Sequence, residues 1–465
     1  MDDNNALVEN VGAIYSQDFS LNTLNILTAA GQKFEMRKLL VEFSFYEDLY
    51  SFCVSGHLTL KDGQGFIESL QLQGNEFIEI DFGKIKDASN DTTSIYRLYK
   101  VGDRVATGNL NVEFYTLYFC SEELLISEQK KISKSLSGQT ISQSISKILK
   151  EDLGVKKAYI EETSGVYNLV VPSLKPFETI SWLSTYARPA ITGAFGADML
   201  FFETKYGYNF RSIQSMMRQN VYATYKYQQT NLPNEVETFQ ESTISVLNYE
   251  FVKTYDQLDD INSGTFANSV LSLDTLARTA NLTKFDYNKY KTNTNVKALD
   301  SNGALTPSQN RFGQTQNQTF ESKFKLTTSN SGQTKASYIK QQPGSVAKDI
   351  AVENYVPNRT AQLSLANYIV VKLTIPGDPG ITVGRTIDFS LMTIKPTLNE
   401  REPDKFYSGK YFATINWGSN DINTDITLSE DPMEHKSHHI ILLDNGQIAL
   451  QPNNRIKWSE PSFVT

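Results

Sequence analysis

The amino-acid sequence predicts a β-rich α+β fold, and three observations carry the prediction. Apolar and polar side chains alternate over many short runs, and a period of two is typical of strands with one buried face. Helical periodicity gathers mainly between residues 122 and 190. The chain has 24 Tyr and 26 Phe against 3 Trp, which suits strands because aromatic side chains pack well on pleated surfaces.

Residues 21–121 are expected to form a first strand-rich unit. Phe52 to Leu60 alternates most clearly, with Cys53 and His57 on the polar side. Turn chemistry follows at residues 62–65, then a short helical link at residues 66–70. We expect a loop at Asp87–Thr93. The other predicted strands are Leu21–Thr28, Lys38–Tyr46, Ile78–Phe82, Ser94–Val101 and Asn109–Cys120. Such a set makes a small antiparallel barrel or sandwich.

Residues 122–190 are expected to form a small α/β unit. Thr140 and Gln143 have the spacing of a capping box, which predicts a helix that runs from Ile141 to Leu153 and stops at Gly154. Pro176 is expected to open a second helix, where its missing N–H costs nothing. Two short strands are predicted between these helices, at Tyr159–Ile160 and Leu169–Val171.

Strands resume after residue 190. Met199–Glu203 and Tyr208–Ile213 predict a hairpin with Gly207 in its turn. Further strands are predicted at Val221–Tyr227, within Thr243–Tyr255, and at Ser269–Leu273, Tyr368–Ile375, Ile381–Leu391, Gly409–Trp417 and Asp425–Glu430. Asn358–Asn367 is expected to be helical.

The stretch between Leu276 and Gly344 differs in composition from the rest of the chain, because polar residues dominate it and apolar residues are few. It is expected to be a long surface excursion or a partly disordered loop. From Leu276 to Ser345 there are ten Lys or Arg against three Asp or Glu, a net charge of +7. Since the whole chain carries −8, the remainder carries −15. A basic segment is thus attached to an acidic body.

Six phrases of the sequence, in this order and spacing, resemble the tail hub (baseplate hub) proteins of long-tailed bacteriophages, relatives of the hub part of type VI secretion spike proteins. The phrases are SGHLTLKDGQGFIESLQLQGNEFIEIDF, LKPFETISWLSTYARP, DMLFFETKYGYNFRSI, IPGDPGITVGRTIDF, SGKYFATINW and TDITLSED. The resemblance covers roughly residues 21–275 and 345–431. It does not account for the basic segment or for the last thirty or so residues.

The resemblance implies two tube-type antiparallel β-barrels with the small α/β domain between them and a long polar insertion in the second barrel. The implied domains are a 1–20 arm, a 21–121 barrel, a 122–190 α/β domain, a 191–275 plus 345–431 barrel, a 276–344 insertion and a 432–465 tail. It also implies a homotrimer whose six barrels join a hexameric tail tube to a trimeric central spike. The ring would enclose a channel through which DNA and the tape-measure protein pass. Tube-initiator and surrounding baseplate proteins would be further partners, and DNA would be a partner only in passage.

Length and composition also bear on the number of domains, on membrane association and on the cellular compartment of the protein. A length of 465 residues suggests about three domains at roughly 150 residues each. No apolar run approaches the ~20 residues of a membrane helix, and the acidic, polar start does not resemble a secretory signal. Cys53 and Cys120 are expected to be buried, reduced thiols of a protein made in the host cytoplasm and assembled into the virion tail. The sequons at Asn281, Asn317 and Asn358 are then chance matches.

Two groups of residues have the side-chain types of an enzymatic site. His435, His438 and His439 supply three imidazoles, the number a catalytic zinc needs, but no glutamate stands near as a general base. Cys53 and His57 share a predicted strand face, yet four residues of strand would hold them too far apart for a hydrogen bond. A solvated linker and a packed strand are the favoured interpretations. We therefore expect no catalytic residue, no metal and no cofactor.

Other chemistries receive less support. No pair of carboxylates stands out for glycoside hydrolysis, and Gly377 and Gly380 sit in a turn between strands rather than in a phosphate loop. The basic segment holds Phe285, Tyr287 and Tyr290 among its lysines, which would permit base stacking; docking on an acidic neighbour is favoured instead. A receptor- or glycan-binding β-rich tail protein is the main alternative to a hub.

Overall fold

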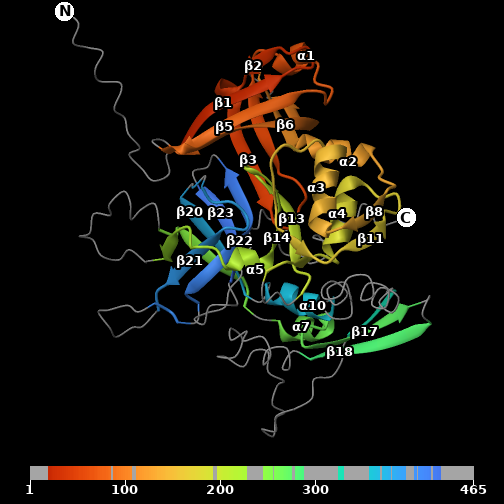
Figure 1. Ribbon diagram of the computed structural model, residues 1–465. Helices are drawn as coiled ribbons and strands as arrows, with labels where there is room; N and C mark the ends of the chain where they lie inside the picture. Colours follow the sequence, from red (N-terminus) through yellow and green to blue (C-terminus); the bar gives the residue numbers. More distant parts are fainter. Residues whose placement is uncertain are drawn as a thin grey trace, which may run out of the picture.

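The structure is a computed structural model of the chain. It describes residues 19–84, 87–106, 112–191, 196–227, 245–254, 256–274, 278–286, 323–328, 356–366, 369–376, 378, 380–393, 403–405, 407–419 and 423–430. Figure 1 shows the strand-rich N-terminal part, a helical part beside it and a second strand-rich part below. The arm at residues 1–18, most of the insertion and the tail after residue 430 lie outside the described residues.

The N-terminal part is a run of antiparallel strands joined by tight turns. The strands are β1 (Phe19–Leu27), β2 (Lys33–Glu35), β3 (Leu40–Asp48), β4 (Ser55–Asp62), β5 (Phe77–Lys84), β6 (Asp87–Ala106) and β7 (Glu113–Cys120), with a 3-10 turn at Arg37–Leu39. Their inward side chains, among them Leu58, Ile80 and Leu117, are fully buried in one core. The alternation in the last strand predicts one shared face for Leu110, Val112, Phe114, Thr116, Tyr118 and Cys120. In the structure Phe114 and Tyr118 turn outward, while Tyr115, Leu117 and Phe119 fill the core.

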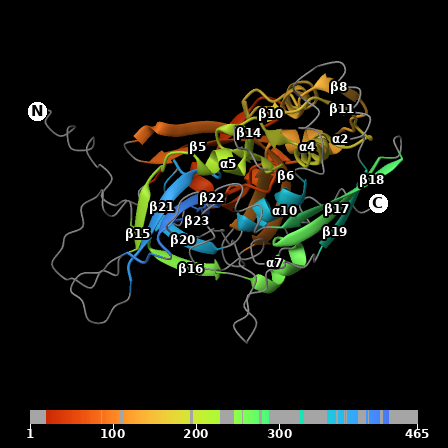
Figure 2. The ribbon, with the colours of Figure 1, turned by 60° about the horizontal axis from the view of Figure 1, so that its bottom comes forward.

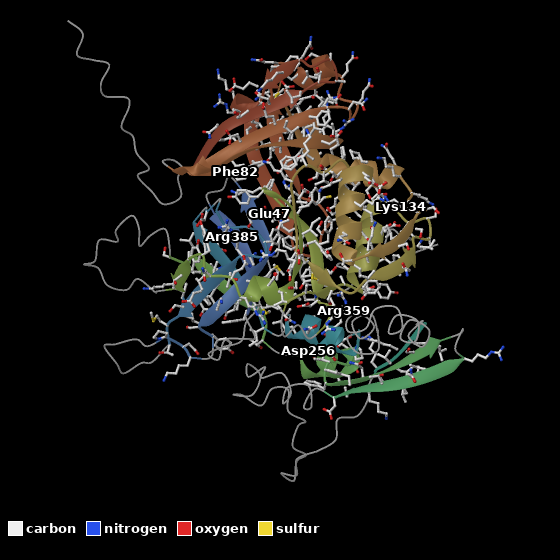
Figure 3. All side chains as sticks on the ribbon, in the orientation of Figure 1. Glu47, Phe82, Lys134, Asp256, Arg359 and Arg385 are labelled. Atoms are coloured by element: carbon white, nitrogen blue, oxygen red, sulfur yellow. The ribbon has the colours of Figure 1, made fainter. Side chains whose placement is uncertain are left out.

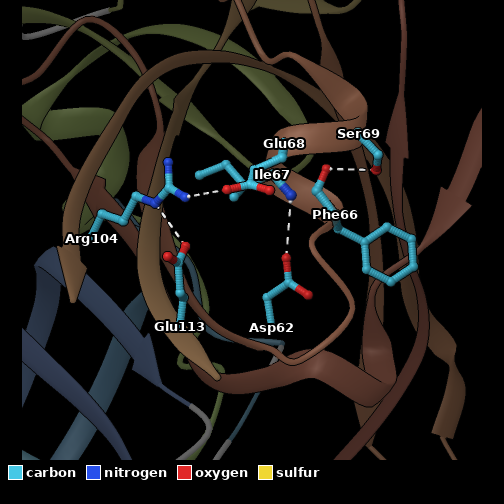
Figure 4. Close-up of polar contacts among 7 residues, drawn as sticks. All are labelled: Asp62, Phe66, Ile67, Glu68, Ser69, Arg104 and Glu113. Carbon is cyan, nitrogen blue, oxygen red and sulfur yellow. Dashed lines mark hydrogen bonds and ion pairs between the residues drawn. The ribbon is translucent and has the colours of Figure 1, made fainter. Parts of the chain in front are cut away.

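Helix α1 (Phe66–Leu70) lies where the sequence predicts a short helical link. Asp62, only 3% exposed, accepts hydrogen bonds from the backbone N–H groups of Gln64 (2.8 Å) and Ile67 (3.2 Å), and so organises the turn and the first helical residues. On the outer side, Arg104 bridges Glu68 and Glu113 (Figure 4). The link is therefore anchored both to its own strand and to the β6–β7 hairpin.

The helical part follows directly. Its elements are α2 (Glu122–Gln129), β8 (Ser135–Gln139), α3 (Ile141–Lys147), a π-helical turn (Ile148–Asp152), β9 (Ala158–Ile160), β10 (Thr163–Ser164), β11 (Tyr167–Val170), α4 (Pro176–Ser184) and β12 (Arg188–Pro189). The capping box is confirmed: the Thr140 hydroxyl accepts from the Gln143 N–H, and the Gln143 side chain accepts from the Thr140 N–H. Pro176 opens α4 as predicted. Helix α2 was not predicted.

The C-terminal half returns to strands. Its elements are β13 (Met199–Thr204), β14 (Gly207–Ser212), α5 (Ile213–Met217), β15 (Thr224–Tyr227), β16 (Asn248–Lys253), α7 (Gln257–Ser263), β17 (Ala267–Asp274), β18 (Thr279–Asp286), β19 (Lys323–Thr328), α10 (Val356–Leu365), β20 (Val370–Pro376), β21 (Thr386–Leu391), β22 (Gly409–Ser419) and β23 (Asn423–Glu430). The predicted β13–β14 hairpin is confirmed. Tyr225, Ile387, Phe389 and Tyr411 form the centre of a second β core.

One sheet of 13 strands runs through both halves. Its order is β16-β20-β23-β22-β3-β4-β7-β6-β5-β1-β2, with β21 beside β22 and β15 beside β21. The halves meet where β22 pairs with β3, from Ile415 opposite Asp48 to Ser419 opposite Ser44. The β-rich α+β class is confirmed. Among the described strands this pairing path stays open from β16 to β2, so closure into two barrels remains a prediction.

Three boundaries differ from the prediction. The strand expected from Phe52 begins at Ser55, because the preceding turn sends the Phe52 ring onto Phe177, with centroids 5.5 Å apart. The expected loop at Asp87–Thr93 is strand, because its backbone continues the ladder with β5. The strand expected from Ile381 begins only at Thr386, because residues 381–384 turn with Gly384 at φ 78°.

The polar insertion also departs from expectation. It was expected to be a surface excursion or a partly disordered loop, yet β18 and β19, both inside it, flank β17 in a three-stranded sheet. The average composition of the segment concealed two short alternating runs that hold Leu282, Phe324 and Leu326. Figure 2 shows this sheet with α10 between it and the rest of the molecule.

Candidate functional site

Cys53 and His57, the candidate catalytic pair, have different neighbours in the structure. Cys53 packs in the core of the helical part, where its Sγ lies 3.5 Å from the Tyr208 hydroxyl. His57 lies on the outer face of β4, between Tyr46 and Tyr118. His435, His438 and His439 lie outside the described residues. Within the described ranges, no group of three or more His, Cys, Asp or Glu is placed to hold a metal ion.

The thiols are buried and reduced, as predicted. Burial raises the pKa of Cys53 well above its ordinary value, and the charge of Glu203 raises it further. Burial also raises the pKa of Cys120 to about 12. Because the thiolate is the nucleophilic form, these positions favour packing over reaction.

A feature that sequence reasoning missed is a buried carboxylate at the seam where the two halves of the sheet meet. Glu47, on β3, is 0% exposed (Figure 3). One of its oxygens accepts from the Lys205 N–H at 2.7 Å, and the other accepts from the Val383 N–H at 3.1 Å. One side chain of the first half thus satisfies backbone donors from two distant loops. We call this the Glu47 clasp.

Glu203 holds the neighbouring joint between β13 and the first half. Its Oε2 accepts from the Val54 N–H at 2.9 Å and from the Ser121 hydroxyl. Burial raises the pKa of Glu203 to about 8, although both hydrogen bonds act in the opposite direction. Burial also raises the pKa of nearby Glu123. Glu203 is therefore mainly protonated at neutral pH, which avoids a charge inside the joint.

Arg359, a half-buried residue of α10, ties this helix to the chain before β13 and interacts through its charge with the buried Asp198. The Arg359 guanidinium donates to the carbonyl oxygens of Ala197 and Ser184, the latter at 3.4 Å. Asp198 accepts from the Gln214 N–H at 3.1 Å. Burial raises the pKa of Asp198 to about 7 and lowers that of Arg359. In Figure 3, Arg359 points from α10 toward the body of the molecule.

Asp378 plays the same role inside the second half. It is 8% exposed and accepts hydrogen bonds from the hydroxyls of Tyr222 (3.3 Å) and Tyr225 (2.9 Å) and from the Gly380 N–H (3.0 Å). Buried carboxylates that bind donors from other segments fix relative geometry, since losing one would leave several donors unpaired. Such buried carboxylates are hard to recognise in the sequence, because single acidic residues inside apolar runs are common.

The outer face of the first half carries a row of ring side chains. Tyr46, His57, Tyr118 and Tyr99 come from β3, β4, β7 and β6 in turn, and successive ring centroids lie 5.8 Å, 5.9 Å and 6.3 Å apart. Lys100 lies over the Tyr118 ring at 4.6 Å. Burial lowers the pKa of His57, so the row is neutral at pH 7. Planar rings on an accessible surface can bind another protein or a sugar.

A groove of about 280 Å³ lies at the end of this row, between the sheet and the helical part. Its walls are mainly apolar, and Lys175, Glu128 and Glu178 stand at its charged side. Lys175 is bound to Glu128 at 2.6 Å.

No protein-family model and no curated protein matches the sequence. Solved structures do match the fold. A tail protein from Neisseria meningitidis MC58 aligns with a TM-score of 0.50 and 9% identity over 90% of this chain and 98% of its own. A tail protein of prophage MuSo2 from Shewanella oneidensis aligns with a TM-score of 0.50 and 9% identity over 88% of this chain and 99% of its own.

An E. coli component of the type VI secretion system aligns at a TM-score of 0.40 with 8% identity, over 90% of this chain and 79% of its own. The likeness in fold rests on the two tail proteins, which are matched over almost their whole length. In the described residues, no helix is long and apolar enough to cross a bilayer. The chain therefore has the fold of phage tail proteins, as its resemblance to the tail hub family predicted.

Proposed function

We propose that this chain is a structural tail hub, a homotrimer that joins a hexameric tail tube to a trimeric central spike. The observation that carries the proposal is the seam between the halves of the sheet. There, β3 pairs with β22 and the Glu47 clasp ties two further loops to the same strand. An adapter between two assemblies must hold its two binding parts in a fixed relation, and a buried, hydrogen-bonded seam supports that role.

Each half would act as one tube-type barrel. The proposed domains are residues 21–121 and residues 191–275 plus 345–431, with the α/β domain at 122–190 between them. Two of the apolar cores, one with Leu58 and Leu117 and one with Tyr225 and Tyr411, lie each within a single proposed barrel, which supports the two barrels. The core of the α/β domain also takes in Met199 and Phe201 of β13, so this domain packs directly on the start of the second barrel. Three chains with two barrels each would give a pseudo-sixfold ring, in keeping with the closed symmetry of most homo-oligomers.

The partners would be the tail tube or tube-initiator proteins on one side and the central spike on the other. The tape-measure protein and surrounding baseplate proteins would be further contacts, and the location would be the baseplate of the virion tail. The protein would be structural rather than enzymatic, with no catalytic residue, metal or cofactor. Its likeness in fold to two tail proteins supports this assignment.

The ring would surround a channel for DNA. The chain outside the basic segment carries −15, and walls of the same sign as the phosphate backbone would not retain it. We expect acidic side chains on the channel wall. A cryo-EM map of the assembled tail that shows a basic lumen would contradict this part of the proposal.

The native mass of the purified chain tests the trimer. Three chains of 52.4 kDa give about 157 kDa, and negative-stain images should show hollow rings. A compact monomer that also stays monomeric with its spike protein would overturn the proposal.

A receptor- or glycan-binding tail protein is the second candidate, and the row Tyr46, His57, Tyr118 and Tyr99 favours it, because sugars stack on such rings. A glycan array separates the two functions. Selective glycan binding together with no affinity for tube or spike proteins would support this candidate over the hub.

A further inference from the structure

The three-stranded sheet of β17, β18 and β19 presents an apolar face to solvent. Leu282 is 54% exposed, Phe324 61% and Leu326 63%. Large apolar side chains at such exposure are ordinary when scattered. Here the strand register places them side by side, so they form one surface. We call it the outer face of the small sheet.

The register defines this face. Leu282 on β18 lies opposite Leu271 on β17, and Leu271 lies opposite Leu326 on β19, which makes a row of three leucines across the sheet. On one side of this row, Ser269 pairs with Phe324 of β19 and with Lys284 of β18; on the other side lies Leu273, opposite Ala280. Ser269 itself is 3% exposed. The leucine row therefore crosses all three strands, with Phe324 beside it on β19 and the cationic Lys284 beside it on β18.

The inner face is already covered. Asn268, Val270 and Ser272 alternate with the outer residues and are at most 1% exposed. Asn268 donates to the Pro357 carbonyl at 3.2 Å, and Lys325 donates to the Thr360 hydroxyl, so this face packs on α10. Helix α10 is in turn held to the body through Arg359. The outer face thus points away from the chain's own body (Figure 2).

Charge indicates which occupant fits. Arg278 and Lys323, at the margins of the sheet, are exposed. They belong to the segment of net charge +7, while the rest of the chain carries −15. The inner face of the small sheet packs on α10, so its outer face points away from the acidic remainder of the same chain. The acidic remainder of a second copy is then the partner of complementary charge. Phe285, which was considered for base stacking, is only 7% exposed and does not offer its ring to a nucleic acid.

We propose that the outer face of the small sheet docks on the acidic body of a second copy of this chain. The proposal rests on the proposed homotrimer and assigns part of its interface to the insertion. Three strands ~4.8 Å apart and three rows ~7 Å apart span on the order of 200 Å². A stable interface buries about 800 Å² on each partner. The small sheet would therefore strengthen the assembly without accounting for all of it.

The experiment measures the concentration at which the full-length oligomer dissociates. The double substitution Leu282→Ser/Leu326→Ser should raise that concentration at least tenfold, because both leucines leave a buried contact. Arg278→Glu/Lys323→Glu should weaken assembly and reduce its sensitivity to salt. Val170→Ser, at an apolar residue 70% exposed on β11, and Lys131→Glu/Lys156→Glu are matched controls that should leave the concentration unchanged.

A photo-crosslinking amino acid at position 324 of the otherwise unchanged chain gives an independent readout. In a mixture of ¹⁴N- and ¹⁵N-labelled protein, we expect mixed-isotope peptides joined to the acidic part of another copy. Cross-links confined to one chain would overturn the proposal, as would unchanged assembly of the Leu282→Ser/Leu326→Ser variant. If the unmodified chain never associates, the homotrimer itself fails; if it associates and these variants do too, only this interface fails.

Discussion

At the scale of single residues, Glu203 links burial to pH. Its pKa is raised to about 8 by burial, against about 4.3 in an unfolded chain. Between these values the folded state holds a proton that the unfolded state has released, so the free energy of unfolding falls as pH rises through that window. Glu203→Gln cannot ionise but keeps an acceptor oxygen for the Val54 N–H. We expect its stability to depend less on pH.

Denaturant unfolding at pH 5 and pH 8.5 measures this difference. At about 1.4 kcal/mol per pKa unit, the unmodified chain should lose on the order of 2–4 kcal/mol more than Glu203→Gln across the interval. Asp198, whose pKa is raised to about 7, contributes the same background slope in both proteins. Glu162→Gln, at an exposed position, is the control and should follow the unmodified chain. Equal slopes for all three proteins would refute the role of Glu203.

At the scale of elements, the capping box at α3 shows what a short local signal can determine. Thr140→Ala removes an acceptor for the Gln143 N–H and should cost about 1 kcal/mol of the free energy of unfolding. Gln143→Ala removes the reciprocal acceptor. Because the two bonds close one ring, the double variant should cost less than the sum of the singles. Strict additivity in denaturant unfolding would show that the two bonds act independently.

The elements that sequence reasoning placed well are those with local determinants. Thr140, Pro176 and Gly207 fix their helix and turn boundaries through backbone chemistry within a few residues. The misplaced boundaries depend on distant contacts. Phe52 leaves the strand pattern to stack on Phe177, and Val383 turns to reach Glu47. Such contacts join segments more than a hundred residues apart, which no local period records.

The candidate site was less predictable than the fold for the same reason. His57 was identified in a strand, but its ring neighbours Tyr46 and Tyr118 come from two other strands. The outer face of the small sheet depends on the register of three strands, and the paired residues of β17 and β19 lie 55 positions apart in the sequence. The amino-acid composition of residues 276–344 predicts the charge of the insertion. Only the pairing of β18 and β19 with β17 determines which of its apolar side chains lie next to one another.

At the scale of the whole molecule, the seam decides whether the two halves move as one body. Glu47→Ala would leave the buried N–H groups of Lys205 and Val383 without their acceptor, at about 1–3 kcal/mol each. We expect the structure to open locally around these two amides more readily than the whole chain unfolds, because the remaining β3–β22 pairing still joins the two parts of the sheet. Hydrogen exchange should therefore quicken at these two amides and along β22, while the β5–β6 ladder keeps its protection.

Glu79→Ala provides the comparison within the same sheet. Glu79 binds Asn25 at 2.8 Å and Lys33 at 2.5 Å on the outside of the first half, so its loss lowers stability without touching the seam. If Glu47→Ala and Glu79→Ala both speed up hydrogen exchange throughout the chain, the chain unfolds as one unit and the Glu47 clasp does not stabilise the seam in particular. If Glu47→Ala alone loosens β22, and if the chain forms the proposed trimeric rings, class averages of rings built from that variant should show a blurred second half beside a sharp first half. That outcome would tie one buried carboxylate to the rigidity that an adapter between tube and spike requires.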